Sequence, residues 1–420
     1  MQTFISNELM GTPDGQEANR ILRSCVHCGF CTATCPTYRL LGDELDSPRG
    51  RIYLIKGLLE GKKSTQKTQL HLDRCLTCRA CETYCPSGVE YGHLLDIGRQ
   101  QLRSTVKRQP VERLQRYLLR LVLPHRNRFR FLLRLGQAVR PLLTGRLKSM
   151  VPSRLKILKI KPEEHKRKMI LFTGCVQPEL APQTNAAASR VLNKLGINAF
   201  EVKNETCCGA LDFHMGEKES AEKYIKKNID LWWPCVEEGV EAIVTTASGC
   251  GVMIKDYGYI LRNDPDYAEK AAQLSSLTKD ISEIFTTEEI ESLKALQERK
   301  DIKTVFQNPC TLQHGQKLGN TTETLLQKLG FDLGQVTDSH LCCGSAGTYS
   351  LLQKELSGQL QQEKIKNLLV GKPEVILTSN IGCQMHLQQA TDVPVKHWIE
   401  LVDEVWNKKW FSGKTREPLK

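Results

Sequence analysis

Two short runs of cysteines with one shared spacing constrain this chain more than any other feature of its sequence. Each run fits the pattern Cys-x2-Cys-x2-Cys-x3-Cys-Pro, in which x is any residue. Thiolates at this spacing ligate [4Fe–4S] clusters: three reach three iron corners of one cube, and the fourth ligates the other cluster of a pair. We therefore assign Cys25, Cys28, Cys31 and Cys85 to the first cluster, and Cys75, Cys78, Cys81 and Cys35 to the second.

Structural zinc sites are the alternative use of these thiolates. Zinc motifs, however, usually space their cysteine pairs by a dozen or more residues, and they have no use for the prolines that end the runs, Pro36 and Pro86. Such prolines would turn the chain away from a cube. The spacing thus favours iron–sulfur clusters, and because exchanged ligands hold two cubes close together, it predicts stepwise electron transfer.

The rest of the composition is that of an ordinary globular protein. With 420 residues, of which 40% are hydrophobic and 25% charged, the chain is long enough for two or three domains. Its 17 cysteines are too many for a reducing cytosol unless most of them bind metal. No run of about 18 apolar residues occurs, and the first residues, MQTFISNELMG, lack the apolar core of a signal peptide. We expect a protein of the cytoplasm that spans no membrane.

A basic segment without cysteines follows the two runs. Residues 102–168 contain 20 Lys and Arg against 3 Asp and Glu, so the net charge of the segment is +17. The net charge of the whole chain is +12, and the remaining residues therefore sum to a net charge of −5. Prolines divide it into what we expect to be helical fragments and linker. Arginines and leucines interleave in RLQRYLLRLVLP and RFRFLLRLGQAVRPLL. This fits helices lying on an anionic bilayer, a face that docks an acidic partner subunit, or a solvated surface. Nucleic acid is a weaker candidate, since no binding module is recognisable.

The remainder of the chain contains an internal repeat. In the first copy Cys175 precedes the pair Cys207-Cys208 by 32 residues, and Cys250 lies 42 residues beyond the pair; in the second copy the separations are 32 and 40 residues. Both pairs are followed by glycine, which would let the backbone approach a bulky ligand, whereas adjacent thiols form only a strained disulfide. Each copy holds enough thiols for one cluster, so a third site is open; the alternative is structural cysteines kept by duplication. The eight candidates are Cys175, Cys207, Cys208, Cys250, Cys310, Cys342, Cys343 and Cys383.

Each single cysteine of the repeat follows a short apolar run. The runs MILFTG, AIVTTASG, TVFQNP and VILTSNIG predict buried parallel strands, and helical patterns such as NAAASRVLNKLG lie between them. A parallel sheet covered by helices binds its ligands at the carboxyl ends of strands, where these cysteines fall. The predicted fold class is α+β multidomain: a helical two-cluster ferredoxin-like domain followed by a duplicated α/β cysteine-rich domain. The predicted parts are 1–101, the basic segment 102–168, the repeats 169–300 and 301–412, and a tail, 413–420.

Several further residues lie near the repeat cysteines or among them. Four histidines are candidate ligands or proton carriers for a quinone: His214, His314, His340 and His386. Taken singly, each is better explained as a hydrogen-bonded loop residue. Cys235 lies outside every motif, and we interpret it as a thiol of the core.

The sequence offers no substrate-oxidising site of its own. There is no Gly-x-Gly-x-x-Gly after a strand, no P-loop and no base placed beside an obvious substrate pocket. A single-electron carrier needs a two-electron flavin on another chain to oxidise a carbon acid. We therefore predict no catalytic residue here, and an FAD-binding dehydrogenase as the partner.

Four stretches carry a resemblance to a known family. They are CVHCGFCTATCPTYRLLGDELDSPRGRIYLIK, HLDRCLTCRACETYCPSGV, HLCCGSAGTYS and VKHWIELVDEV. They are similar to the iron–sulfur subunits of bacterial glycolate oxidases, and the similarity extends over nearly the whole chain. The resemblance implies a subunit of a glycolate dehydrogenase that converts glycolate to glyoxylate and also accepts D-lactate. It further implies electron transfer from the flavoprotein to a membrane acceptor such as quinone, at the cytoplasmic side of the inner membrane, with the protein bound peripherally.

Related domains in heterodisulfide reductases end each cysteine set with Cys-x-x-Cys, whereas here Cys250 is followed by Met253 and Cys383 by His386. The sequence therefore leaves the third cluster open. Three other functions also stay open. They are the iron–sulfur subunit of a lactate or glycerol 3-phosphate dehydrogenase, a heterodisulfide-reductase-like thiol enzyme that uses the paired cysteines, and a metal-stabilised scaffold or nucleic-acid binder.

Overall fold

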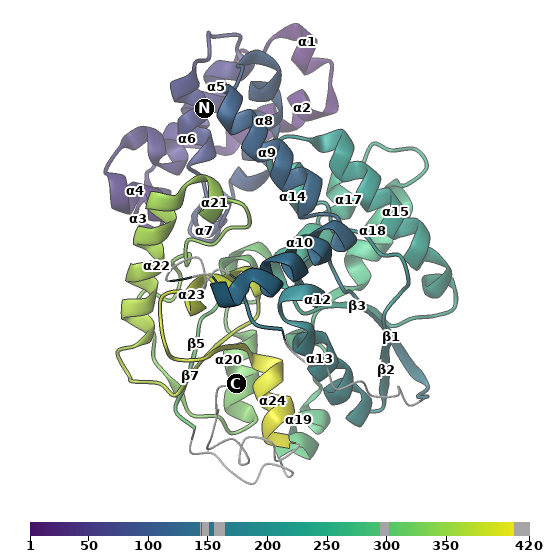
Figure 1. The fold of residues 1–420 in the computed structure, drawn as a ribbon. Helices are drawn as coiled ribbons and strands as arrows, with labels where there is room; N and C mark the ends of the chain where they lie inside the picture. Colours follow the sequence, from purple (N-terminus) through teal and green to yellow (C-terminus); the bar gives the residue numbers. More distant parts are fainter. Residues whose placement is uncertain (143, 145–150, 155–163, 295–301, 407–420) are drawn as a thin grey trace.

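A helical N-terminal part and two similar units of parallel strands and helices make up the molecule (Figure 1). The computed structural model describes residues 1–142, 144, 151–154, 164–294 and 302–406. In Figure 1 the N-terminal helices lie above the two units, the first on the right and the second on the left. This architecture confirms the predicted fold class. The predicted tail, 413–420, and the predicted boundary at residues 300 and 301 lie outside the described residues.

The N-terminal helices begin where the sequence supplies caps. The Thr12 side chain accepts from Gly15 N–H ahead of Pro13, and the Ser47 side chain accepts from Gly50 N–H ahead of Pro48. The apolar sides of these helices share one core. The last helix continues to Thr105, past the predicted boundary at 101. The elements are α1 (Asn7–Met10), α2 (Pro13–Ser24), α3 (Phe30–Ala33), α4 (Pro36–Leu41), η1 (Glu44–Asp46), α5 (Pro48–Leu59), α6 (Gln66–Asp73), α7 (Ala80–Thr83) and α8 (Tyr91–Thr105).

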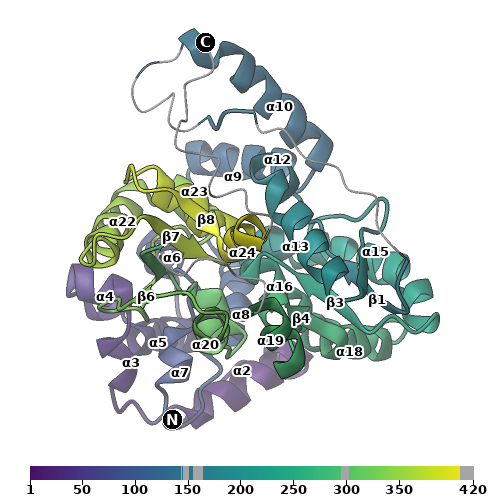
Figure 2. The ribbon, with the colours of Figure 1, turned by 90° about the horizontal axis from the view of Figure 1, so that it is seen from below.

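The basic segment forms two amphipathic helices where it is described, as predicted. Helix α9 (Pro110–Val122) starts at a proline, which suits the first position of a helix, and α10 (Arg126–Val139) leads into the short helix η2 (Arg140–Leu142). In Figure 2, α10 stands out from the body of the molecule, with α9 between it and the rest.

Two four-stranded sheets with the same topology form the repeat. All pairings are parallel, and the strand orders are β2-β1-β3-β4 and β6-β5-β7-β8. The predicted buried parallel strands are confirmed by β1, β3, β5 and β7. The strands are β1 (Arg167–Leu171), β2 (Ile197–Phe200), β3 (Ala242–Thr245), β4 (Thr278–Asp280), β5 (Thr304–Phe306), β6 (Leu333–Gly334), β7 (Val375–Thr378) and β8 (Val395–His397).

Helices cover both faces of each sheet, which explains why the strands read as apolar runs rather than as alternating patterns. In the first unit these are α12 (Gln177–Leu180), α13 (Pro182–Lys194), α14 (Ala210–His214), α15 (Lys218–Glu237), α16 (Ser248–Lys255), α17 (Tyr257–Ile260), α18 (Ala268–Leu277), η3 (Ile281–Glu283) and α19 (Thr287–Lys294). In the second they are η4 (Thr311–Gly315), α20 (Thr321–Lys328), α21 (Tyr349–Leu352), α22 (Lys354–Leu368), α23 (Ile381–Gln388) and α24 (Trp398–Trp406).

One hydrophobic core joins the two units. Met169 and Leu171 of β1 share it with Val375 and Leu377 of β7, whereas the intervening Ile170 faces a separate core. The C-terminal helix α24 packs on α13 of the first unit, and at that contact Arg190 and Asp403 form an ion pair at 2.6 Å. The two sheets are therefore held as one block, with their cysteine-bearing ends fixed relative to each other.

Candidate metal centres

The two cysteine runs of the N-terminal part adopt the same loop. In the first run His27 and Gly29 have left-handed φ angles of 57° and 88°, and in the second the matching Thr77 and Arg79 have φ angles of 53° and 58°. Residues alternating into the left-handed region turn successive backbone N–H groups toward one concave side, the arrangement found at many iron–sulfur sites. Each loop is thus shaped to surround an anionic group.

The loops line two cavities. The first is lined by Cys25, Cys28, Cys31, Cys81 and Cys85, and the second by Cys35, Cys75, Cys78 and Cys81. Cys85 lies in the first lining and Cys35 in the second, as the exchange of fourth ligands predicts, and Cys81 lies between the two cavities. Pro48, Cys81 and Tyr91 line both cavities, so the two sites share a wall.

The spacing of the thiols distinguishes a cluster from a single metal ion. Four sulfurs at about 2.3 Å from one zinc ion lie roughly 3.8 Å from each other. Over the described residues, which include all the motif cysteines, no three cysteine sulfurs lie within 4.8 Å of one another. The eight N-terminal thiols are thus spread more widely than a mononuclear zinc site requires, which favours a larger group such as the [4Fe–4S] cube.

The two cavities differ in exposure. Cys28 is exposed, and Cys31 and Cys85 of the same cavity are partly exposed. In the second cavity Cys35, Cys75 and Cys81 are buried and only Cys78 is partly exposed. The first site therefore opens to the surface, whereas the second lies inside the molecule.

Buried polar groups also contact the sulfurs of the second cavity. The guanidinium of Arg51, whose side chain is 1% exposed, has Nη1 at 3.9 Å from Cys35 Sγ and donates to Thr37 Oγ1 at 3.1 Å and to Asp46 Oδ1 at 3.1 Å. The Tyr91 hydroxyl donates to Cys75 Sγ at 3.5 Å. Such donors stabilise negative charge on cluster sulfurs.

Burial alone does not favour thiolates at these positions. It raises the pKa of Cys31 to about 11 and the pKa values of Cys78 and Cys81 well above that of an ordinary thiol. Iron would compensate for this cost, because a coordinated thiol loses its proton to the metal. The buried thiols therefore suit ligation better than free reactivity.

The repeat cysteines gather at the carboxyl ends of the strands, as expected for parallel sheets. Contacts between the thiols of Cys175, Cys207, Cys208 and Cys250 link the first set; hydrogen bonding to Cys207 raises the pKa of Cys175, and the same bond lowers that of Cys207. The second set, Cys310, Cys342, Cys343 and Cys383, is linked in the same way, with 3.8 Å between Cys310 Sγ and Cys342 Sγ.

The glycine after each cysteine pair has a different role from the expected one. Gly209 and Gly344 have φ angles of 91° and 89°, and a Cβ at these positions would lie 3.2 Å from Ala221 O and 2.6 Å from Ser357 O. The close approach is therefore to the backbone of the next long helix, α15 or α22. Glycine is required here by a left-handed turn and by helix packing.

The two sets differ in their surroundings. Seven residues beyond Ala221 the first unit has Asn228, which donates to Cys207 O at 3.0 Å; seven beyond Ser357 the second unit has Lys364. Lys364 is 2% exposed and donates to Ser339 O at 2.9 Å; burial lowers its pKa, and negative charge on the four thiols of the second set opposes that shift. The second set alone thus has a buried cation at this position.

The second set also lies beside the N-terminal part. Leu76 packs in one cluster with Cys310 and Cys342, and Cys78 packs against that cluster. A ligand of the inner cavity is therefore next to two thiols of the second repeat.

Comparisons with known proteins agree with this geometry. A model described as a 4Fe-4S dicluster domain matches residues 21–89, and one described as a cysteine-rich domain matches residues 169–255 and 304–388. The glycolate oxidase iron–sulfur subunit of Escherichia coli is 51% identical over 410 residues, which cover 97% of this chain and 100% of that protein. The chain belongs to the family of glycolate oxidase iron–sulfur subunits.

A second relative in the glycolate oxidase iron–sulfur subunit family matches over most of its length. The probable glycolate oxidase iron–sulfur subunit of Bacillus subtilis is 30% identical over 413 residues, or 91% of each chain. Lactate utilization protein A of Bacillus licheniformis is 25% identical over 225 residues, which cover 52% of this chain and 90% of that protein. The likeness to glycolate oxidase subunits thus includes both the dicluster part and the repeat.

The four histidines of this family member are all engaged within the chain or packed in it. His214 Nδ1 lies 3.0 Å from Asp96 Oδ1, His314 Nδ1 lies 2.9 Å from Thr83 Oγ1, and His386 Nε2 lies 3.3 Å from Ser357 Oγ. His340 packs edge-on against Tyr84. The description as loop residues was wrong for three of them, because His214, His314 and His386 lie within helical segments. Their contacts join elements far apart in the sequence.

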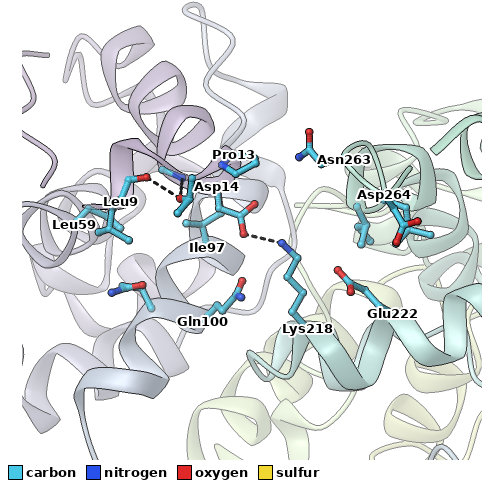
Figure 3. Close-up of a pocket in the computed structure, with 15 residues that line it drawn as sticks. Leu9, Pro13, Asp14, Leu59, Ile97, Gln100, Lys218, Glu222, Asn263 and Asp264 are labelled. Atoms are coloured by element: carbon cyan, nitrogen blue, oxygen red, sulfur yellow. Dashed lines mark hydrogen bonds and ion pairs between the residues drawn. The ribbon is translucent and has the colours of Figure 1, made fainter. Parts of the chain in front are cut away.

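Two other features lie apart from the cysteine sites. Cys235 is partly buried in α15 and packs against the core of the first unit. A cavity of about 360 Å³ lies where α2 and α8 meet the first unit (Figure 3). Asp14 and Lys218 form an ion pair across it at 2.7 Å. Asp264 pairs with Lys226 at 2.5 Å. Both acidic groups are paired within the chain, and the Asp14–Lys218 pair joins the N-terminal part to the repeat.

Sequence reasoning missed the residues that surround the sulfurs: Arg51, Tyr91, Asn228 and Lys364. None of them belongs to a motif, and their roles depend on burial. The available signals were that Arg51 lies in one of the stretches that carry the family resemblance and that Tyr91 stands near the second cysteine run. Among the described helices, none is both long enough and apolar enough to cross a bilayer.

Proposed function

We propose that this chain is the electron-transfer subunit of a complex that oxidises glycolate to glyoxylate, with the substrate and FAD bound by a partner flavoprotein. The observation that carries the proposal is the pair of cysteine-lined cavities with a shared wall, in a chain 51% identical over 97% of its length to a glycolate oxidase iron–sulfur subunit. The clusters supply one-electron oxidation and reduction when they are bound.

The chain's own residues have three tasks under this proposal. Cys25, Cys28, Cys31 and Cys85 hold the outer cluster near the surface, where a flavoprotein can approach Cys28. The other four N-terminal cysteines hold the inner cluster, away from water. The shared wall keeps the two sites close, which one-electron transfer between them requires.

We assign a third cluster to the second repeat only, held by Cys310, Cys342, Cys343 and Cys383. A cluster with four thiolate ligands is an anion, and Lys364 places a buried cation at this site where the first repeat has the neutral Asn228. The position of Cys78 beside Cys310 and Cys342 supports a path from the inner cluster into the second repeat. The cysteines of the first repeat are then structural.

The proposed final acceptor is a membrane quinone, and the proposed place of the protein is the cytoplasmic side of the inner membrane, bound peripherally. No described helix crosses a bilayer, so attachment would depend on a surface rather than on a span. D-Lactate is a proposed second substrate of the complex, since it is also a 2-hydroxy acid.

The main alternative is the iron–sulfur subunit of a lactate dehydrogenase. The match to lactate utilization protein A gives it some support, but that match covers 52% of this chain. The two functions differ in the flavoprotein that reduces the clusters, so a comparison of partners separates them.

The test is anaerobic purification with iron and sulfide analysis, followed by EPR before and after addition of glycolate and the flavoprotein. We expect about twelve irons per chain, four for each cluster, and reduced-cluster signals only when both substrate and flavoprotein are present. An iron content of about eight atoms per chain would refute the third cluster but leave the rest of the proposal standing. Zinc in place of iron, or clusters that stay oxidised beside an active flavoprotein, would refute the proposed function.

A further inference from the structure

Each of the two helices of the basic segment exposes an apolar stripe. On α9, Val111, Leu114, Tyr117, Leu118 and Leu121 are all exposed, from 37% at Leu121 to 67% at Val111. On α10 the exposed apolar residues are Phe131, Leu132, Leu135 and Val139, with Phe131 at 68%. Their spacing of three and four residues places each group along one side of its helix. We call these nine residues the α9–α10 face.

Four arginines of the two helices lie on the other side and pair with the body of the molecule. At 100° per residue, Arg116 and Arg120 lie on the side of α9 opposite the apolar stripe. Arg116 pairs with Asp73 of α6 at 3.1 Å, and Arg120 pairs with Asp212 of α14 at 3.0 Å.

Helix α10 has the same arrangement. Arg126 and Arg130 lie opposite its stripe and pair with Glu179 of α12 at 2.9 Å and 2.7 Å. Both helices are therefore inverted relative to an ordinary surface helix, which turns its apolar side inward. Ion pairs hold each charged side against the body and leave the apolar side facing outward.

The charge that remains outside is positive. Arg113, Arg128 and Arg134 are exposed on the two helices. The acidic residue of the helices, Glu112, is partly buried and pairs with Arg108 and Arg116 at 2.5 Å and 2.8 Å. An apolar surface bordered by arginines complements a layer of acyl chains beneath anionic headgroups.

We infer that the α9–α10 face lies in the headgroup and acyl boundary of an anionic bilayer. This inference rests on the proposed function, in which the protein is peripheral to a membrane, and it names the surface that makes the contact. A bilayer fits better than a protein partner, because protein interfaces carry about one hydrogen bond per 100–200 Å². Of the nine side chains of the face, only Tyr117 has a polar group. Helix α10 also projects from the body, as a contact with a broad layer requires (Figure 2).

The test is flotation of the full-length, cluster-loaded protein with two kinds of vesicle. One contains phosphatidylglycerol and phosphatidylethanolamine, and the other contains phosphatidylcholine alone. We expect binding to the anionic vesicles at moderate salt and weaker binding to the neutral ones. The variant Leu118→Asp/Leu135→Asp should bind at least about tenfold more weakly, because it places a charge in each stripe. The matched control is Val370→Asp, at an exposed apolar residue just beyond α22, and it should bind like the wild type.

Two outcomes would overturn the inference. One is equal flotation of the wild type and the double variant. The other is no flotation of the wild type while the double variant loses co-purification with the flavoprotein, which would make the face a protein interface. Cluster reduction by glycolate and flavoprotein in solution is measured on the same samples. If the clusters of the wild type are not reduced, the proposed function is refuted. If the clusters of every variant are reduced and only flotation changes, the result bears on the membrane surface alone.

Discussion

Arg51 should raise the reduction potential of the inner cluster and leave the outer one unchanged. Its guanidinium is fully buried and lies 3.9 Å from Cys35 Sγ. At that distance a unit charge on the sulfur would interact with it by about 4 kcal/mol at an effective dielectric constant of about 20. An added electron spreads over iron and several sulfurs, and Asp46 offsets part of the cation. We therefore expect Arg51 to stabilise the reduced cluster by about a third of that energy, roughly 1.4 kcal/mol. This corresponds to a shift in reduction potential of about 59 mV for one electron.

The perturbation is Arg51→Gln, compared with Arg51→Lys, which keeps the charge. Asp46 retains Arg74 at 2.8 Å in both variants, so the buried carboxylate is not left without a cation. The assay is an anaerobic redox titration followed by EPR, with iron content and circular dichroism as checks on folding. We expect the potential of the inner cluster to fall by about 59 mV in Arg51→Gln, while that of the outer cluster stays unchanged. Arg51→Lys should show a smaller change.

Tyr91→Phe gives an independent measurement, because it removes the hydroxyl that donates to Cys75 Sγ at 3.5 Å without changing the size of the ring. It should lower the same potential as Arg51→Gln. The reasoning is refuted if the potentials of the inner and outer clusters move equally, if neither moves in properly folded protein, or if Arg51→Lys shifts the potential as far as Arg51→Gln does.

Three further predictions follow from the sites. Cys35→Ser should remove the same EPR signal as Cys78→Ser; loss of the signal that Cys28→Ser removes would contradict the exchange of ligands. Cys343→Ser should lower the iron content from about twelve to about eight atoms per chain, whereas Cys208→Ser should leave it unchanged; equal losses would place clusters in both repeats. Burial lowers the pKa of His397 to about 3, so the unfolded chain binds a proton between about pH 6.5 and 3 that the folded chain does not. The free energy of unfolding should therefore decrease as pH falls below about 6.5, by at most about 1.4 kcal/mol per pH unit from this group. Denaturant titrations of His397→Gln at pH 7.5 and 5.5 should show a smaller decrease, and an identical decrease would contradict the assignment.

Most of the site could be predicted from the sequence because its geometry is local. Three cysteines within seven residues can reach only one cube, so the spacing alone assigns Cys25, Cys28 and Cys31 to one site. The parallel strands were equally readable, because strands buried on both faces form short runs that are mostly apolar, as in β3 and β7, where only the last residue, a threonine, is polar.

Expectations about single residues were less successful. Gly209 and Gly344 were expected to make room for a ligand, but they make room for the backbone of α15 and α22. His214, His314 and His386 were expected in loops, but they lie in helical segments and bridge distant elements. In each case the sequence indicated that the residue had a particular role, but it did not show which residue would lie next to it in space.

The sequence by itself determined which residues can hold iron and that strands would carry the repeat cysteines to one edge of each sheet. Only the tertiary structure decided how the two repeats differ, through Lys364 in one and Asn228 in the other, and which side of α9 and α10 faces outward. The basic segment reads as positively charged, yet its inward arginines pair with Asp73, Asp212 and Glu179, residues up to 92 positions away. Burial and ion pairing depend on residues that are distant in the sequence and that folding brings together. A local sequence pattern therefore cannot predict them.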